Sequence, residues 1–344
     1  MAKEQKKPQF PSELRFDLIS KDWVVIATGR GKKPEMFKEA KRAKITIPKK
    51  DCPFCNIETQ GNPSLVYYKG EKVKTEGFSK KWTTVVIPNK FPAFLPDSKI
   101  ETKIEGNLYQ TISAVGFCEL VVIKDHEKQL SDLEIMQVKE IFDAYQQRYL
   151  DLMKKSFVSY VSIFHNQGQE AGASQPHSHS QIITTPLIDV DLKRALFNSK
   201  KYLRKTGKCV HCEMINWDRK MKSRIVFENN DFIAICPFAS KSDFQTIVTP
   251  KKHLSNFELI TEGEKWQLSE VFREVLRKIC KALNYPSYNF YLHTAPADGK
   301  QYSYYHWHWT ILPKTSVWAG FEIGTRMEIS AIAPEKAAEY LRRQ

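Results

Sequence analysis

Two stretches of this chain carry cysteines and histidines in the same order, and this repeat constrains the fold more than any other feature. Each stretch opens with a Cys-x-x-Cys pair, at Cys52/Cys55 and at Cys209/Cys212. A histidine follows in each stretch. A His-x-His pair then begins 51 residues later in the first (126 to 177) and 53 residues later in the second (253 to 306). This agreement in order, residue type and spacing predicts an internal duplication.

The expected secondary structure repeats in the same way. A helix is predicted over 131–155 in the first half and over 261–283 in the second, each followed by a strand. Ser131 is expected to cap the first helix, with Glu134 at the capping-box position. In the strands after the helices, His165 is expected to correspond to His293. Strands are expected at 83–87, 107–112, 117–123, 157–164, 224–227, 231–235, 244–248 and 288–293.

These elements predict an α+β fold of two related halves packed side by side. Each half is expected to hold an antiparallel sheet and a helix that follows a metal-binding histidine. The expected division is residues 1–195 and residues 196–344. The halves would meet around 186–205, where Pro186 and a charged segment intervene.

The most distinctive single stretch covers residues 164–183. A strand-like apolar run breaks into a glycine-containing loop and resumes as an alternating segment. Glycine allows backbone N–H groups to approach a phosphate closely. His177, His179 and Gln181 then recur with period two, so an extended backbone places them on one face. This layout indicates chemistry at phosphorus, and a polar strand facing solvent is the less favoured interpretation.

The repeated cysteines and histidines are expected to form two structural zinc sites. Thiolate and imidazole suit Zn²⁺, and four protein ligands leave no position for a catalytic water. The expected ligands are Cys52, Cys55, His126 and His177 in the first site and Cys209, Cys212, His253 and His306 in the second. At the second site His211 and His293 compete as ligands, and His308 could join. The alternative is a set of reduced structural cysteines near surface histidines.

Composition limits the partners. A formal net charge of +14, from 53 basic and 39 acidic residues, suggests anionic ligands. The lysines are scattered without a basic–aromatic block, which favours sugar nucleotides and phosphates over nucleic acid. No apolar run approaches the roughly 20 residues that span a bilayer. The first residues are polar, so a cytoplasmic location without membrane association is expected.

These motifs resemble the galactose-1-phosphate uridylyltransferases, a branch of the histidine-triad superfamily, over almost the whole chain. The residues that fall on that family's active-site motif are Asn166, Gly168, Gly172, Ser174, His177, His179 and Gln181. The first cysteine–histidine set falls on the family's first zinc site. Residues 177–181 and 320–325 are most similar to the ADP-glucose phosphorylase-like members. The resemblance implies duplicated histidine-triad-like halves with antiparallel sheets and packed helices, and a homodimer.

The resemblance also implies a ping-pong reaction through a covalent nucleotidyl-histidine, with His179 as the nucleophile. A neutral imidazole is a good nucleophile toward phosphorus near pH 7. Ser174, Gln181 and loop N–H groups would stabilise charge on the phosphoryl oxygens. The residues that match family positions near the nucleotide are Arg30, Asn89 and Phe91.

The chain departs from the family's pattern in its second half. No acidic residue follows His179 at the offset of a ligand in the uridylyltransferases' second metal site, and a second Cys-x-x-Cys pair is present instead. Thr325 and Arg326 replace the Tyr-Glu that contacts the hexose in that family, so the identity of the hexose stays open. His308 holds the nucleophile-equivalent position without the preceding loop. It is interpreted as a vestige, or as part of a metal or substrate site.

Three functions account for some or all of these features. The first is a hexose-1-phosphate nucleotidylyltransferase that passes UMP or another NMP from an NDP-sugar to His179 and then to a hexose 1-phosphate. The second uses inorganic phosphate as acceptor, which makes an NDP-sugar phosphorylase with ADP-glucose as its leading substrate. The third, a zinc-stabilised nucleic-acid-binding protein, leaves the glycine–histidine motif unexplained. The motif itself determines neither the base nor the acceptor.

Overall fold

The fold is that of a computed structural model, which describes residues 12–30, 33–37, 46–78, 81–97 and 99–344. A large antiparallel sheet organises the described residues. Its strands in the first half are β3 (Leu65–Tyr68), β4 (Glu71–Val73), β5 (Thr84–Pro88), β8 (Cys118–Ile123), β9 (Tyr160–Gln167) and β10 (His179–Thr185). Its strands in the second half are β11 (Ile225–Glu228), β12 (Phe232–Ile235), β13 (Thr246–Pro250), β14 (Tyr288–His293) and β15 (His308–Pro313).

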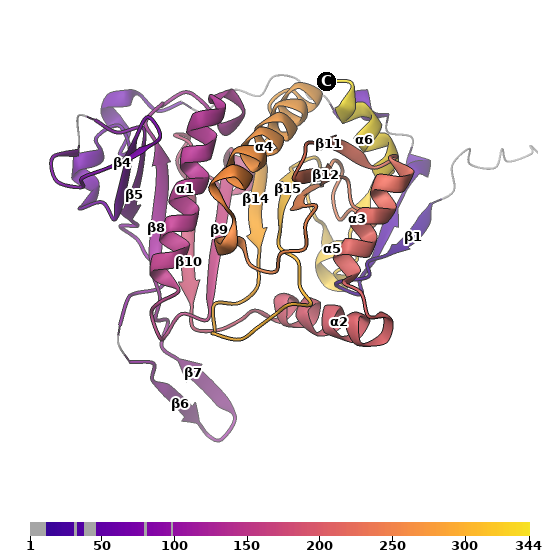
Figure 1. Ribbon diagram of the computed structural model, residues 1–344, viewed down its shortest axis with the longest axis horizontal. Helices are drawn as coiled ribbons and strands as arrows, with labels where there is room; N and C mark the ends of the chain where they lie inside the picture. The colour runs from indigo at the N-terminus through magenta and orange to yellow at the C-terminus, as the bar shows by residue number, and fades with distance from the viewer. Residues whose placement is uncertain (1–11, 31–32, 38–45, 79–80, 98) are drawn as a thin grey trace, which may run out of the picture.

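The order of these strands displays the duplication. Across the sheet they run β4-β3-β5-β8-β10-β9-β14-β15-β13-β12-β11 (Figure 1). The run β5-β8-β10-β9 therefore matches β12-β13-β15-β14, read from the outside toward the centre, with antiparallel pairing throughout. The two copies join where β9 pairs with β14. The predicted α+β fold is confirmed, with the two sheets joined edge to edge into one.

Two long helices cover one face of the sheet and share its core. They are α1 (Ile135–Leu152) and α4 (Glu262–Leu283), which pack against each other (Figure 1). Phe142 of α1 meets Phe272 of α4 edge to face, with ring centroids 5.3 Å apart. Trp309 of β15 contacts both rings and is fully buried. The apolar core is therefore continuous across both halves, which ties their stability together.

The start of α1 differs from the prediction, whereas that of α4 agrees with it. Residues Leu130–Asp132 form a 3₁₀ turn first, and the Ser131 hydroxyl donates to the Asp132 carboxylate (3.2 Å) rather than capping the helix. The α-helix then begins at Ile135, after Glu134. At α4 the Thr261 hydroxyl accepts from the Glu264 N–H (3.3 Å), which satisfies a backbone donor of the first turn.

The charged segment around 186–205 is not a linker but a helix, α2 (Val190–Thr206). Asp189 caps its N-terminus by accepting from the Leu192 N–H (2.8 Å). Leu192 and Leu196 bury one face, and this i, i+4 pair explains why the helix forms. The expected boundary between residues 195 and 196 falls inside α2, and the division of the chain there stays a prediction. The other helices outside the prediction are α3 (Val210–Met221), α5 (Gly320–Thr325) and α6 (Pro334–Arg342).

The N-terminal strands lie with the C-terminal half. A small sheet joins β1 (Glu13–Phe16), β2 (Trp23–Ile26) and β16 (Ile329–Ser330), with β16 parallel to β2. The guanidinium of Arg15 pairs with the carboxylate of Glu335 in α6 (3.0 Å). The duplicated halves of the sequence are therefore not separate bodies in space.

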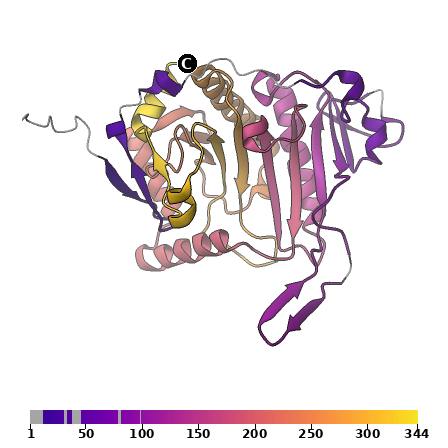
Figure 2. The same ribbon diagram turned by 180° about the vertical axis from the view of Figure 1, so that it is seen from behind.

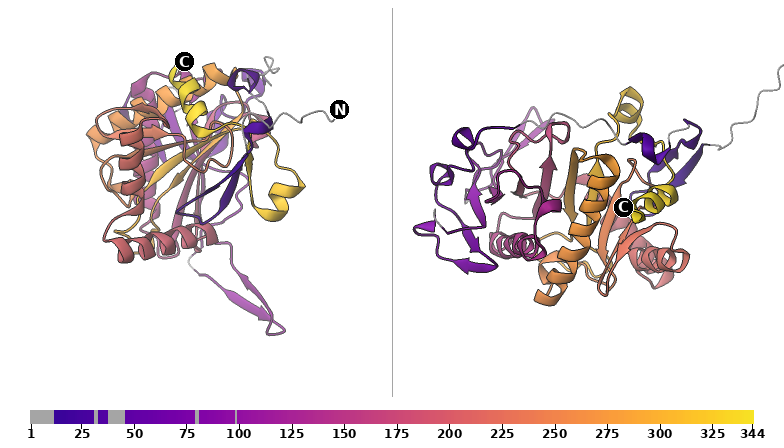
Figure 3. Two further views of the ribbon diagram at one scale, coloured as in Figure 1. Left: turned by 90° about the vertical axis from the view of Figure 1, so that its right-hand side faces the viewer. Right: turned by 90° about the horizontal axis from the view of Figure 1, so that it is seen from above.

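A hairpin of β6 (Thr102–Glu105) and β7 (Tyr109–Ile112) projects from the body of the molecule (Figure 3). Seen from behind, β9 and β10 present the sheet face that α1 and α4 leave uncovered (Figure 2). Among the described residues, the helices are all too short or too polar to cross a membrane.

Candidate functional site

The strand β10 points His179 away from the helices. Its neighbour Ser180 faces α1, where its hydroxyl accepts from the Tyr145 hydroxyl (2.5 Å). Because side chains alternate along a strand, His179 and Gln181 lie on the opposite face of the sheet. Gln181 stands opposite Phe164 of β9, and His179 is one step further toward Asn166. The prediction aligned three side chains on one face, and β10 places two of them, His179 and Gln181, there. His177 precedes the strand, and its Nδ1 faces Cys52 instead. The structure brings Asn166 to the face of His179.

The imidazole of His179 is held in one orientation by the backbone. Its Nδ1 lies 2.9 Å from the carbonyl oxygen of His177, so that nitrogen carries the proton and donates. Nε2 is then left with a free lone pair. The ring packs against Phe54, with centroids 4.9 Å apart. Burial lowers the pKa of His179 below its ordinary value, which favours the neutral, nucleophilic form.

The four predicted ligands of the first site converge. Cys52 Sγ lies 3.3 Å from His177 Nδ1, Cys55 Sγ lies 3.2 Å from His126 Nδ1, and the two Nδ1 atoms are 3.3 Å apart. A tetrahedral zinc ion with ordinary Zn–N and Zn–S bonds separates its ligand atoms by about 3.3 to 3.8 Å. The set already has the spacing that a zinc ion requires.

Outer hydrogen bonds make both imidazoles of this cluster ready to bind a cation. His126 Nε2 lies 2.8 Å from the Ile47 carbonyl and His177 Nε2 lies 2.7 Å from the Ile123 carbonyl. Each Nε2 must therefore donate, which leaves the two Nδ1 atoms unprotonated and facing each other. Two lone pairs at 3.3 Å repel, and a cation between them removes the repulsion. The chemistry of the donor set thus fits zinc.

The second cluster copies the first. Cys212 Sγ lies 3.3 Å from His253 Nδ1 and 3.6 Å from His306 Nδ1, and Cys209 completes the group of four. His306 Nε2 lies 2.9 Å from the Pro250 carbonyl, as His177 does from that of Ile123. Among the described residues, His211, His293 and His308 lie outside both groups of four. Cys209 is the N-cap of α3, and Cys212 lies in the first turn of that helix.

The fold and both clusters can be compared with known proteins. Residues 2–188 match the N-terminal domain of galactose-1-phosphate uridyl transferase, and residues 196–343 match its C-terminal domain. The chain belongs to the galactose-1-phosphate uridylyltransferase family.

Two relatives within the family are similar over nearly their whole length. The chain is 32% identical to an ADP-glucose phosphorylase of Arabidopsis thaliana, over 96% of this chain and 92% of that protein. It is 26% identical to a galactose-1-phosphate uridylyltransferase of Thermotoga maritima, over 96% and 98%. A crystal structure of an Arabidopsis ADP-glucose phosphorylase with bound ADP-glucose superposes with a TM-score of 0.80 at 29% identity, covering 97% of this chain and 99% of that one.

The loop before the family's histidine motif is tight, and it depends on two glycines with positive φ. Gly168 has φ of +81°, and a Cβ there would lie 2.3 Å from Ser287 Oγ. Gly172 has φ of +85° and ends the short 3₁₀ turn. The N–H groups of Ala171, Gly172 and Ala173 donate to carbonyls of the same loop. These three N–H groups are therefore already used within the loop, whereas Ser174 is exposed and Gln181 is half-buried.

One residue from the second half, Asn289, positions the motif of the first. Its amide nitrogen donates to Asn166 Oδ1 and to the Ala171 carbonyl, at 2.8 Å each. β14 brings Asn289 opposite Asn166 in the sheet. The sequence carries no local signal for this contact, because only the pairing of β9 with β14 creates it.

Replacing Asn289 with alanine is expected to slow nucleotidyl transfer by about 10- to 100-fold, because Asn166 and the loop lose a shared anchor. The first-turnover rate with labelled NDP-sugar measures this. Asn229→Ala is the matched control, since that amide also donates to a backbone carbonyl (2.9 Å) but far from β10. Equal rates for both variants would contradict a positioning role.

Of the three residues predicted to lie near the nucleotide, Asn89 lies away from His179 and Phe91 is exposed. Asn89 follows β5, and its N–H donates to Cys118, which pairs with Ile183 at the other end of β10. At roughly 3.3 Å per residue, that end is about 13 Å from His179. The Phe91 side chain is 90% exposed rather than packed. Arg30 ends a 3₁₀ turn, and its side chain lies outside the described part of the structure.

The predicted correspondence of His165 with His293 is wrong by one residue. His165 faces the helices, where its Nδ1 lies 3.0 Å from Ser180 Oγ and its ring stacks on Phe290. His293 pairs with His308 on the opposite face, as Asn166 lies across from His179. A shift of one residue moves a side chain to the other face of a sheet. Asn166 is therefore the counterpart of His293, and His165 is a core histidine.

Proposed function

We propose that this chain is a nucleotidyltransferase that moves a nucleoside monophosphate from an NDP-sugar to a second phosphate-bearing acceptor through a covalent intermediate on His179. The observation that carries the proposal is the hydrogen bond from His179 Nδ1 to the His177 carbonyl. It leaves Nε2 free on the uncovered face of the sheet, beside Gln181 and Asn166. Family membership supports the same chemistry.

Each half-reaction exchanges one bond at phosphorus. Nε2 of His179 attacks the α-phosphorus, a P–N bond forms, and the P–O bond to the sugar 1-phosphate breaks. The leaving group is already a stable anion, so a strong general acid is not required. An oxygen of the acceptor phosphate then attacks, and the P–N bond breaks. Gln181 and Ser174 are the proposed donors to the phosphoryl oxygens during both steps.

Two acceptors are compatible with this chemistry. A hexose 1-phosphate makes the chain a uridylyltransferase-type enzyme, which the similarity to the Thermotoga uridylyltransferase supports. Inorganic phosphate makes it an ADP-glucose phosphorylase, which the higher identity to the Arabidopsis phosphorylase supports. For the donor, the Arabidopsis structure with bound ADP-glucose supports a nucleotide sugar.

Zinc is the proposed occupant of both cysteine–histidine clusters, and its role is structural. Cys52, Cys55, His126 and His177 would hold the first ion. When bound, zinc supplies a rigid cross-link and no reacting group. Because His177 is both a ligand and the residue whose carbonyl orients His179, the cross-link fixes the nucleophile. A homodimer and a cytoplasmic location are further parts of the proposal, which rest on the family and on the sequence.

Discharge of the labelled enzyme is expected to identify the acceptor. The protein is first loaded from UDP-glucose or ADP-glucose labelled in the α-phosphate, and the accepted donor identifies the base. Galactose 1-phosphate, glucose 1-phosphate or inorganic phosphate is then added. Glucose 1-phosphate reverses the loading step in either enzyme and is the positive control. We expect galactose 1-phosphate and inorganic phosphate to differ at least about tenfold in the rate at which they remove the label, since an acceptor must be aligned to react. Formation of an NDP-galactose indicates the transferase and formation of an NDP the phosphorylase, whereas release of the free monophosphate alone contradicts both.

A further inference from the structure

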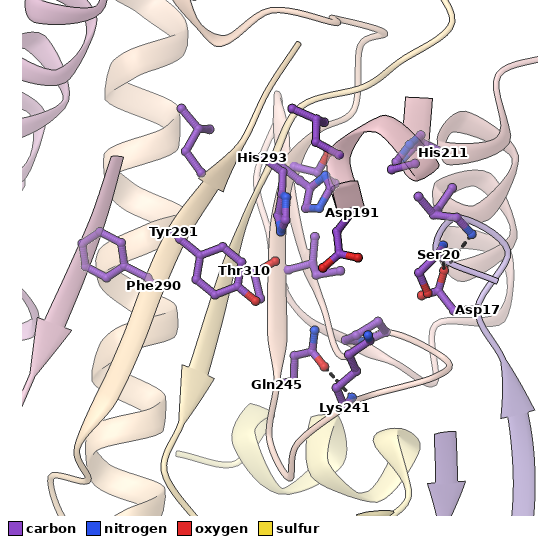
Figure 4. A pocket seen from close by; sticks show the side chains of 18 of the residues that line it. Asp17, Ser20, Asp191, His211, Lys241, Gln245, Phe290, Tyr291, His293 and Thr310 are labelled. Atoms are coloured by element: carbon purple, nitrogen blue, oxygen red, sulfur yellow. Dashed lines mark hydrogen bonds between the residues drawn. The ribbon is translucent and has the colours of Figure 1, made fainter. Parts of the chain in front are cut away.

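A cavity of 570 Å³ lies over β14, β15 and the adjoining β9, on the face of the sheet that also carries His179 (Figure 4). Its floor is made by β14, β15 and neighbouring strands. Its walls come from α2, α3 and the turn between β1 and β2. Such a volume suits a small-molecule ligand. The ligands of the two cysteine–histidine clusters and His179 itself do not line the cavity, whereas Asn166 and Phe164, on the face of β9 beside His179, form one edge of it.

The duplication relates this cavity to the proposed active site. His308 and Thr310 are the counterparts of His179 and Gln181, and all four point to the same face. His293, the counterpart of Asn166, stacks on His308 with ring centroids 4.7 Å apart. The second half therefore keeps polar side chains at three positions whose counterparts in the first half are proposed to contact the substrate. It lacks the glycine loop that precedes His177.

The charges around the cavity disfavour a phosphate. Lys241 is paired with Asp22 (2.8 Å) and Glu328 (3.6 Å). Arg194 is paired with Asp22 (3.1 Å) and Asp191 (2.9 Å). Both cations of the wall are thus neutralised by carboxylates, and Asp191 itself points into the cavity (Figure 4). An anion entering here would meet carboxylates without a free counter-charge.

The remaining polar groups suit a neutral ligand with many hydroxyls. The Tyr291 and Thr310 hydroxyls, the Gln245 amide and the His293 imidazole surround a common space (Figure 4). Two buried polar atoms of lining residues, Arg194 Nε and His211 Nε2, lack a hydrogen-bond partner within the described structure. Buried polar atoms rarely lack a hydrogen-bond partner, so a ligand with hydroxyl groups would accept hydrogen bonds from these two atoms or donate to them. Aromatic side chains beside such groups add the apolar contact that sugar rings favour.

We propose that this cavity binds an uncharged sugar of one or two hexose units, at a site distinct from His179. The proposal does not depend on the transferase reaction. The catalytic half handles phosphate-bearing ligands, whereas the duplicated half has lost the phosphate loop and keeps the sugar-type polar face.

Calorimetric titration of the metal-loaded protein with glucose, galactose and maltose tests the proposal. We expect at least one of them to bind saturably to the wild type and equally to His179→Ala. Thr310→Val and Tyr291→Phe each remove one hydroxyl with little change in shape, and each is expected to weaken binding about three- to tenfold. His293→Phe fills the cavity and is expected to abolish binding. The two isosteric variants decide the outcome if His293→Phe does not fold.

Three results would overturn the sugar site. The first is a lack of saturable binding by all three sugars. The second is loss of sugar binding in His179→Ala, which would place the ligand in the active site instead. The third is tighter binding of glucose 1-phosphate or adenosine than of any free sugar, when that binding is itself lost in Thr310→Val. Failure of these titrations leaves the covalent chemistry of His179 untouched, so the two proposals fail separately.

Discussion

Alanine in place of His179 is expected to abolish covalent labelling of the protein by an NDP-sugar that carries ³²P in its α-phosphate. The variant has no lone pair at the position of Nε2, so the first half-reaction has no nucleophile. Catalytic transfer is expected to fall by about 10³-fold or more, as removal of a covalent nucleophile does elsewhere. Label retained on the wild-type protein after denaturation in base, and lost in acid, identifies the phosphoramidate.

The pseudo-equivalent His308 supplies the matched control. His308 Nδ1 lies 3.4 Å from the His306 carbonyl, a looser copy of the 2.9 Å contact between His179 and His177. Its ring is stacked on His293 and sits at the cavity over β14, β15 and β9. His308→Ala is therefore expected to keep the label. Labelling that survives in His179→Ala, or that disappears only in His308→Ala, would show that His179 is not the nucleophile.

Serine in place of Cys52 is expected to remove one zinc ion from about two per chain and to lower transfer by about 10- to 100-fold. The expected loss of activity has a specific structural cause. Without the ion, the two Nδ1 atoms of His126 and His177 lose the cation between them. The backbone at His177 is then less well held, and its carbonyl no longer fixes the imidazole of His179. Metal analysis and the first-turnover rate measure the two effects on the same sample.

Two further substitutions separate this cause from a general loss of stability. Cys209→Ser is expected to remove the other zinc ion while the labelling of His179 is largely retained, because that cluster lies in the second half. Cys118→Ser alters a buried thiol of β8 outside both clusters and is expected to keep both ions. An unchanged metal count in Cys52→Ser or Cys209→Ser would remove that site from the proposal. Equal loss of activity in all three variants would contradict the prediction that the first metal site acts on His179 through the His177 carbonyl.

The continuous sheet explains why one half supports the other. Asn289 and Ser287, both in or next to β14, contact the loop of the first half. Phe142 and Phe272 join the two long helices over a common core. The first half therefore keeps its catalytic geometry partly through residues of the second. This dependence gives a physical reason for both halves to persist when the proposed nucleophile lies in only one of them.

Much of the candidate site follows from local patterns. The period of two in His177, His179 and Gln181 predicted a shared face, and β10 places His179 and Gln181 there. Spacing alone grouped the four cysteines and four histidines into two sets of four, as the structure does. The helix over 261–283 followed from its periodicity, and the structure shows Thr261 as its N-cap. By contrast, the 3₁₀ turn before α1 and the helix α2 were missed, because short turns and charged helices carry weak apolar signals.

The sequence by itself determined which residue types recur, in what order, and with what local period. Those properties were enough for the family, the duplication and the two cysteine–histidine sets. Only the tertiary structure decided which face of the sheet each residue occupies and which strand lies beside it. His165 turned out to be a core residue, Asn166 the counterpart of His293, and Asn289 the anchor of the loop. The reason is that strand pairing joins residues far apart in the chain, and a shift of one residue in register exchanges the two faces.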